Sequence, residues 1–290
     1  MVCWTTVVRS GAVLVAMSFV LGGCGDGRDG AADPDGTAAP TGSSPPPSLS
    51  VVVVGDSIPY NSPADCAGCV GFVESYGEAL GEELGEPVGT ANLSRHDGAR
   101  TRDIVVQLAS GELDETLATA DVVIMSVGFN DQPPYTDPDQ PCHVDEPASD
   151  EDAVDAVVAT TRDCVDTVTA TLRRTLARGL RELRERAPGA TVAALVPYDA
   201  WNGWAALDAL PVAQGRSVTR LVSYALDAWR TALCAEMVEA GGVCVDVYRA
   251  FNGPDGAQPS GELLAPDYTH PSQEGNDRIR DVLLAARLLG

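Results

Sequence analysis

Two segments far apart in the sequence carry side chains that can act together as a nucleophile and its base. Ser57 ends the segment Gly55-Asp56-Ser57, and His270 ends the segment Asp267-Tyr268-Thr269-His270. A serine becomes a nucleophile when a neighbouring base takes its proton, and histidine is a base near neutral pH. Asp267, three residues before His270, can reach its Nδ1 within a turn and fix its tautomer. Together these residue types are the ones that nucleophilic catalysis with a general base requires.

A third segment contains a hydrogen-bond donor suited to the negative charge that develops on a carbonyl oxygen. Gly128-Phe129-Asn130-Asp131 follows an apolar run, and the amide of Asn130 can donate to such an oxyanion. Taken alone, each of the three segments is also typical of an ordinary turn or helix cap. The prediction therefore depends on a fold that brings the segments together.

The elements that must position these residues alternate along the chain. The β-branched run 51–54 is typical of a strand that is buried on both faces. The strand candidates are 51–54, 88–93, 121–127, 191–196 and 243–247, and the helix candidates are 72–84, 101–108, 151–187 (one helix or two), 212–240 and 271–289. This alternation predicts a three-layer α/β/α sandwich with a central parallel sheet of about five strands. Ligands bind beyond the carboxyl ends of such strands, where Ser57 and Asn130 lie.

The segments occur in the order that characterises one hydrolase family. The chain resembles the GDSL, or SGNH, hydrolases over residues 50–289, a family with a flavodoxin-like fold. The matching blocks are Gly55-Asp56-Ser57, Asn92 to Gly98, Gly128-Phe129-Asn130-Asp131 and Asp267 to His270. The resemblance implies Ser57 as nucleophile, His270 as base and Asp267 as its orienting acid. It also implies that the oxyanion donors are the Gly98 N–H, the Asn130 amide and the Ser57 N–H. The reaction that the resemblance implies requires no metal or organic cofactor.

The second block departs from the family pattern. Asn92 and Gly98 are one residue further apart than the family spacing, so the N–H of Asp97 or Ala99 is an alternative donor to that of Gly98. His96 lies beside Gly98, and we interpret it as a loop histidine without a chemical role; a place in the lining of the substrate pocket is the alternative.

The N-terminus has the pattern of an export signal. Arg9 precedes the apolar run 11–21, which fits a signal-peptide core and is too short to span a bilayer. The run ends in Leu21-Gly22-Gly23-Cys24, which resembles a bacterial lipobox with Cys24 as the lipidated residue. An ordinary secretory signal with an unrelated cysteine is the alternative.

These features predict three regions. Residues 1–23 are expected to be a lipoprotein signal peptide. Residues 24–48, rich in glycine, proline and serine, are expected to form a flexible tether. Residues 49–290 are then the hydrolase domain, exported and either secreted or held at the outer face of the cell membrane by a lipid on Cys24.

Six of the eight cysteines lie in the predicted domain. An even number of cysteines in an exported domain predicts disulfides, although sequence alone cannot choose among the pairings. The simplest choice pairs sequence neighbours, as Cys66–Cys69, Cys142–Cys164 and Cys234–Cys244. A redox-active Cys66-Ala67-Gly68-Cys69 is an alternative, and a metal site is disfavoured because no second closely spaced Cys or Cys/His pair follows. The second pairing would tie the acidic, proline-rich segment 132–150 to the following helix at the rim of the site.

Charge excludes several classes of partner. The chain has 19 Lys and Arg against 42 Asp and Glu, a net charge of -23. This charge repels nucleic acid and disfavours attachment to anionic lipid through a basic patch. We expect a monomer whose partners are a small-molecule or lipid ester and, through Cys24, the membrane.

The predicted function is an extracellular carboxylic ester hydrolase, an esterase or lipase. A carbohydrate O-deacetylase acting on cell-wall or environmental glycans, an acyltransferase and a non-catalytic binding lipoprotein are the alternatives. The joint presence of Ser57, Asn130, Asp267 and His270 disfavours the last of these. The acyl chain and alcohol of the substrate are not encoded in these motifs. Tyr198, Trp201 and Trp204 follow the fourth strand candidate and are expected either to line the substrate site or to cover the edge of the core.

Overall fold

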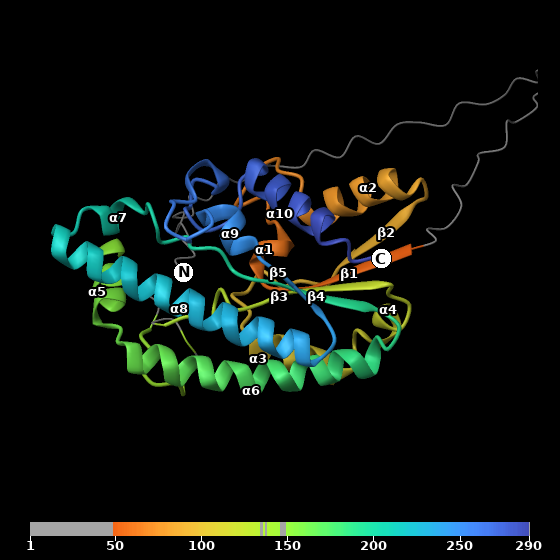
Figure 1. The fold of residues 1–290 in the computed structure, drawn as a ribbon, viewed down its shortest axis with the longest axis horizontal. Helices are drawn as coiled ribbons and strands as arrows, with labels where there is room; N and C mark the ends of the chain where they lie inside the picture. Colours follow the sequence, from red (N-terminus) through yellow and green to blue (C-terminus); the bar gives the residue numbers. More distant parts are fainter. Residues whose placement is uncertain (1–48, 134–135, 137, 146–148, 290) are drawn as a thin grey trace, which may run out of the picture. The chain divides into compact units, whose positions relative to one another are not determined.

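A parallel β-sheet forms the centre of the domain (Figure 1). The structure, a computed structural model, describes residues 49–133, 136, 138–145 and 149–289. The predicted signal peptide, the tether and Cys24 lie outside the described residues. The strands are β1 (Leu49–Gly55), β2 (Val88–Asn92), β3 (Val122–Ser126), β4 (Thr191–Leu195) and β5 (Val243–Val245). They pair in the order β2-β1-β3-β4-β5, and every pair is parallel, which confirms the predicted fold class.

Helices cover both faces of the sheet (Figure 1). One face carries α2 (Phe72–Leu84), α9 (Val247–Asn252) and α10 (Gln273–Ala286); the other carries α3 (Thr101–Ser110), α6 (Arg162–Arg186) and α8 (Val212–Glu239). The shorter helices are α1 (Ser57–Tyr60), α4 (Asp114–Leu117), α5 (Asp150–Ala159), α7 (Ala205–Asp208) and the 3₁₀ turn η1 (Gly261–Leu263). The three layers are thus helices, sheet and helices.

The helical segment predicted over 151–187 forms two helices. Thr160 ends α5 in an extended conformation, with a φ of -64° and a ψ of 139°. Thr161 then begins α6, because its side chain accepts a hydrogen bond from the Cys164 N–H.

Alternating strand residues divide between two hydrophobic cores. Val51 and Val53 pack with α2 and α10, whereas Val52 and Val54 pack with α6 and α8. Successive side chains of a strand point to opposite faces, so a run that is apolar at every position can bury all of its side chains only between two layers. The exposed fraction is at most 1% at each of these four valines.

The sheet order brings the ends of β1 and β3 together. The chain passes from β1 to β2 on one side and then returns to β3 on the other, so the order reverses at β1. Gly55 pairs with Ser126 at the carboxyl ends of the two strands. Loops that leave a sheet at such a reversal form the usual ligand site of this architecture.

Three disulfides lie within the described residues: Cys66–Cys69, Cys142–Cys164 and Cys234–Cys244. They confirm the pairing of sequence neighbours. Cys142–Cys164 joins the acidic segment after β3 to the first turn of α6, and Cys234–Cys244 joins α8 to β5.

No helix in the described part of the chain is long and apolar enough to cross a membrane.

Candidate active site

Ser57 lies in the tight turn between β1 and α1. A Cβ on Gly55 would lie 2.6 Å from the carbonyl oxygen of Ser126, so only glycine allows β1 to end this close to β3. Asp56 is the N-cap of α1, and its carboxylate accepts a hydrogen bond of 3.0 Å from the Ile58 N–H. The exposed fraction of Ser57 is 4%, so its hydroxyl lies just beneath the surface.

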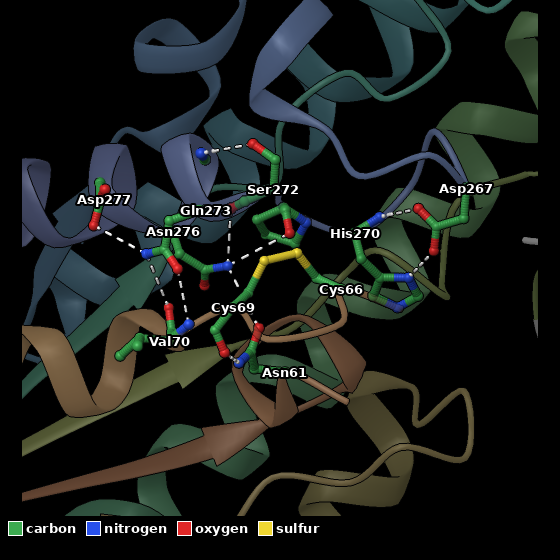
Figure 2. Close-up of a disulfide and its surroundings, with 12 residues drawn as sticks. Asn61, Cys66, Cys69, Val70, Asp267, His270, Ser272, Gln273, Asn276 and Asp277 are labelled. Carbon is green, nitrogen blue, oxygen red and sulfur yellow. Dashed lines mark hydrogen bonds and ion pairs between the residues drawn. A yellow bond between two sulfur atoms is a disulfide. The ribbon is translucent and has the colours of Figure 1, made fainter. Parts of the chain in front are cut away.

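The predicted acid, base and nucleophile form one hydrogen-bonded chain. His270 Nε2 lies 2.9 Å from Ser57 Oγ, and His270 Nδ1 lies 2.6 Å from Asp267 Oδ2. Figure 2 shows the two contacts between Asp267 and His270, one to the ring and one to the backbone. In the neutral histidine, Nδ1–H donates to Asp267 and Nε2 accepts from the serine hydroxyl. This arrangement can remove the serine proton and stabilise the imidazolium that forms.

Electrostatics favour an ionised Asp267 beside a histidine whose pKa is raised. Burial alone would lower the pKa of His270, but the hydrogen bond to Asp267 and nearby carboxylate charges raise it above its usual 6.5. Burial alone would raise the pKa of Asp267, but hydrogen bonds from His270 and from the Thr269 N–H hold it below its usual range. Asp267 therefore stays ionised while His270 exchanges its proton.

Tyr198 supports the Asp267–His270 loop from the side of the core. The hydroxyl of Tyr198 donates a hydrogen bond of 2.6 Å to the carbonyl oxygen of Thr269. The Tyr198 ring stacks on Phe251 at 4.2 Å and meets the edge of Phe129 at 4.6 Å. Because its exposed fraction is 2%, Tyr198 covers the edge of the core.

The other two aromatic candidates lie further along the same loop. Trp201 and Trp204 contact each other edge to face at 5.5 Å. Trp201 also lines a cavity of about 160 Å³ together with Asp199 and Asn202.

The start of α10 places His270 relative to α2. The Asn276 side chain is fully buried, and its Oδ1 accepts a hydrogen bond of 3.0 Å from the Phe72 N–H. Its Nδ2 donates to the carbonyl oxygen of Ser272 at 3.0 Å, as Figure 2 shows around Asn276. The Ala265 N–H donates to the carbonyl oxygen of His270 at 2.8 Å and closes the loop on its other side.

The two predicted oxyanion donors lie on adjoining loops. Asn130 Nδ2 donates a hydrogen bond of 2.8 Å to the carbonyl oxygen of Ala99, the residue after Gly98. A primary amide has two hydrogens, so the second remains for an oxyanion. Gly98 is exposed, and no atom lies within 4 Å of the position that a Cβ would take, so its peptide borders open space. Asn92 Nδ2 ties the same loop to the nucleophile turn through the Pro59 carbonyl oxygen at 2.6 Å.

A second acid–histidine pair lies beside His270, and the sequence reasoning missed it. Asp65 Oδ2 lies 2.8 Å from His96 Nε2 and 3.5 Å from His270 Nε2. The rings of His96 and His270 have centroids 6.4 Å apart. His96, interpreted from sequence as a loop histidine without a role, therefore adjoins the triad. The position of Asp65 directly before Cys66 was the one sequence signal of a fixed loop at this point.

Asp65, Asp267 and His270 also form a group that could hold a metal, since one ligand atom from each lies within 4.8 Å of the others. The Asp267–His270 hydrogen bond and the Ser57–His270 hydrogen bond already engage both ring nitrogens. His270 therefore has no ring nitrogen left for a metal ion while both hydrogen bonds are in place.

Comparisons with known proteins agree with this architecture. Residues 53–278 match the GDSL-like Lipase/Acylhydrolase family. The lipase Lip_vut3 from a goat rumen metagenome has 18% sequence identity and a TM-score of 0.62, covering 83% of this chain and 98% of that one. An extracellular lipase from Streptomyces rimosus has 19% identity and a TM-score of 0.52, covering 82% and 99%.

The phospholipase A1 of Streptomyces albidoflavus NA297 has 18% identity and a TM-score of 0.50, covering 82% of this chain and 99% of that one. No curated protein sequence matches this chain. At these identities the structural likeness establishes the fold alone.

Proposed function

The chain belongs to the GDSL-like lipase/acylhydrolase family, and on that premise we propose that it is an extracellular carboxylic ester hydrolase with Ser57 as nucleophile. The observation that carries the proposal is the unbroken chain of hydrogen bonds from Ser57 through His270 to Asp267, at 2.9 Å and 2.6 Å. An orienting acid, a base and a nucleophile within hydrogen-bond reach are the requirements of serine acyl transfer.

The reaction begins when His270 Nε2 takes the proton of Ser57 Oγ as that oxygen attacks the ester carbonyl. Asp267 holds the ring in the productive tautomer and stabilises its positive charge. The imidazolium then protonates the departing alcohol, and an acyl group remains on Ser57. A water molecule, activated by His270 in the same way, releases the acid.

The negative charge on the tetrahedral intermediate requires donors. The second amide hydrogen of Asn130, the Gly98 N–H and the Ser57 N–H are the proposed set. Removing one such donor typically costs about 10²–10³ in rate. The open space beside Gly98 supports its place in the set, because a substrate oxygen must approach that peptide closely.

A fluorophosphonate probe tests the nucleophile, because it reacts only with an activated serine. Wild type should be labelled, whereas Ser57→Ala should not. Ser75→Ala is a matched control, since Ser75 is also a buried serine but lies on α2. Failure to label the folded wild type would exclude a catalytic role and leave a binding protein.

His270→Ala tests the base. We expect ester hydrolysis to be abolished while the thermal midpoint changes little, because the imidazole is partly exposed and packs at the surface. Near-normal turnover in this variant would show that another base serves Ser57.

We further propose that the domain is exported and anchored through a lipid on Cys24. The three disulfides support export, because such bonds persist in oxidising compartments. Cells fed labelled palmitate should incorporate it into the wild type and not into Cys24→Ser. Equal labelling of both proteins would refute the anchor and leave a secreted enzyme.

A further inference from the structure

The Asp65 carboxylate lies near His270 Nε2, the atom that delivers a proton to the leaving alcohol in the proposed reaction. Asp65 Oδ2 lies 3.5 Å from His270 Nε2, the same nitrogen that lies 2.9 Å from Ser57 Oγ. The usual acid of a serine hydrolase contacts the opposite ring nitrogen, as Asp267 does at Nδ1. Asp65 therefore lies beside Nε2, the ring nitrogen of His270 that faces Ser57 and would exchange protons with the substrate.

The loop that carries Asp65 is rigidly held. The N–H groups of Asp65 and Cys66 both donate to the carbonyl oxygen of Ser62, at 3.0 Å and 3.1 Å. The Cys66–Cys69 disulfide closes the loop, and Asn61 Nδ2 donates to the Cys69 carbonyl oxygen at 3.1 Å. Figure 2 shows this disulfide between Asn61 and the start of α10.

The far end of the loop is joined to α10. The Val70 N–H donates to Gln273 Oε1 at 2.8 Å, three residues after His270. The carboxylate and the catalytic imidazole are thus fixed to one framework. A binding group held in this way pays little ordering entropy when substrate arrives.

His96 orients the Asp65 carboxylate and leaves it accessible. The Asp65–His96 contact is 2.8 Å, and Tyr60 packs on the His96 ring at a centroid distance of 5.1 Å. The exposed fractions of the two side chains are 14% for Asp65 and 31% for His96. The pair is therefore sheltered yet open to a small polar group.

Resting on the proposed ester hydrolysis, we propose that Asp65 and His96 form a subsite for the alcohol part of the substrate. The subsite takes an alcohol that bears a second hydroxyl on the carbon next to the one that carries the ester oxygen. The oxygens of such a vicinal pair lie about one hydrogen-bond length apart. When the leaving oxygen meets His270 Nε2, the neighbouring hydroxyl is within reach of Asp65 and donates to it.

This contact holds the alcohol in place while the ester bond breaks. The tetrahedral intermediate collapses, the C–O bond to the alcohol breaks, and its electron pair goes to the leaving oxygen. That oxygen takes the proton from His270 Nε2, which becomes neutral again, and the acyl group stays on Ser57. The neighbouring hydroxyl keeps its own proton throughout and donates it in a hydrogen bond to the carboxylate. An alcohol with a phosphate or carboxylate at this position is repelled by Asp65.

A matched pair of esters tests the subsite. 2-Hydroxyethyl butyrate and 2-methoxyethyl butyrate share the acyl group and the carbon skeleton, but only the first has a donor. We expect wild-type kcat/KM to favour the hydroxyethyl ester by about tenfold or more, as for a hydrogen bond to a charged group. The ratio should fall towards one in Asp65→Ala and fall part of the way in Asp65→Asn.

Asp281→Asn is the control variant, because it removes the same charge from an exposed position on α10. It should keep the wild-type ratio. A purely structural role for Asp65 would lower kcat/KM for both esters alike and leave the ratio unchanged, which would overturn the inference. A wild-type kcat/KM ratio near one for the two esters would also overturn the inference.

Fluorophosphonate labelling separates this result from failure of the proposed function. If the protein is labelled but the ratio is near one, the proposed subsite is refuted and the proposed hydrolase stands. If the folded protein is not labelled, the proposed hydrolase is refuted as well. Glycerol monobutyrate and a mono-O-acetylated methyl glucoside, each compared with its O-methylated counterpart, present the same diol from two sources. Preference for either free diol over its methylated counterpart supports the subsite, and its absence in both pairs overturns it.

Discussion

Replacing Gly128 by alanine should destabilise the domain and disturb the turn that carries Asn130. Gly128 has a φ of 107°, a conformation that residues with a side chain rarely adopt. An added Cβ would also lie 2.0 Å from Nε1 of Trp229, whose exposed fraction is 0%. Because the indole is a rigid, fully buried ring of α8, it cannot move aside cheaply.

The two penalties act together. A strained backbone conformation costs about 1–3 kcal/mol. Overpacking a well-filled core costs about 1–3 kcal/mol. We therefore expect Gly128→Ala to lower the free energy of unfolding by about 2–6 kcal/mol, a large share of the roughly 5–15 kcal/mol that stabilises a typical domain.

Urea unfolding followed by tryptophan fluorescence measures this loss. Gly189→Ala is the matched control, because nothing lies within 4 Å of its Cβ position and its φ is not positive. That change should alter stability by less than about 1 kcal/mol. Adding Trp229→Phe should relieve the clash but not the backbone strain, with a coupling energy of about 1–3 kcal/mol. An unchanged unfolding midpoint in Gly128→Ala, or zero coupling, would refute the packing argument.

Four further predictions concern Asp267, His270, Tyr198 and Asp199. Asp267→Asn should lower kcat/KM for ester hydrolysis by about 10⁴, because it leaves His270 in the wrong tautomer; a loss below tenfold would contradict the assignment. The raised pKa of His270 means that wild-type kcat/KM falls as the pH drops through a value above 6.5, since only the neutral ring accepts the serine proton. A pH–rate profile in which this limb lies below 6.5 would argue against that shift. Tyr198→Phe removes the hydrogen bond to the Thr269 carbonyl oxygen and should cost about 1–3 kcal/mol in urea unfolding, with a fall in kcat; equal stability would mean that the bond contributes nothing. Burial raises the pKa of Asp199 to about 6, and its Oδ2 has no hydrogen-bond partner among the described residues. The folded state therefore disfavours the charged form, and wild type loses stability relative to Asp199→Asn as the pH rises from the unfolded to the folded pKa. From about pH 4 to about pH 6 the variant should gain steadily on wild type, approaching about 3 kcal/mol above the folded pKa, whereas a constant difference would contradict the shift.

Short-range patterns account for what could be predicted of the fold. The run 51–54 identified β1 because four consecutive β-branched residues suit a strand buried on both faces. Helix ends were less accurate, since the break between α5 and α6 depends on the backbone of Thr160 and the cap at Thr161. The four-residue helix α1 has no period to detect and is held by the Asp56 cap.

The site was harder to predict, because it is assembled from segments that are far apart in the sequence. Ser57 and His270 were proposed from the types and order of their motifs, and Asp267 from a spacing within one turn. Asp65 escaped notice because its neighbours in sequence say nothing about His96 or His270. Tyr198 was expected near the site from its place after the fourth strand candidate, but its hydrogen bond to a loop 71 positions away could not be predicted.

The sequence by itself determined the chemical groups, the alternation of strands and helices, and the local turns in which Ser57, Asn130 and Asp267 stand. Those features depend on residues within a few positions of one another. Only the tertiary structure decided which groups share a hydrogen bond, which carboxyls are buried and how the pKa of His270 is shifted. Such properties depend on distance and on exclusion of water, and both are set by loops that meet at the sheet end after folding.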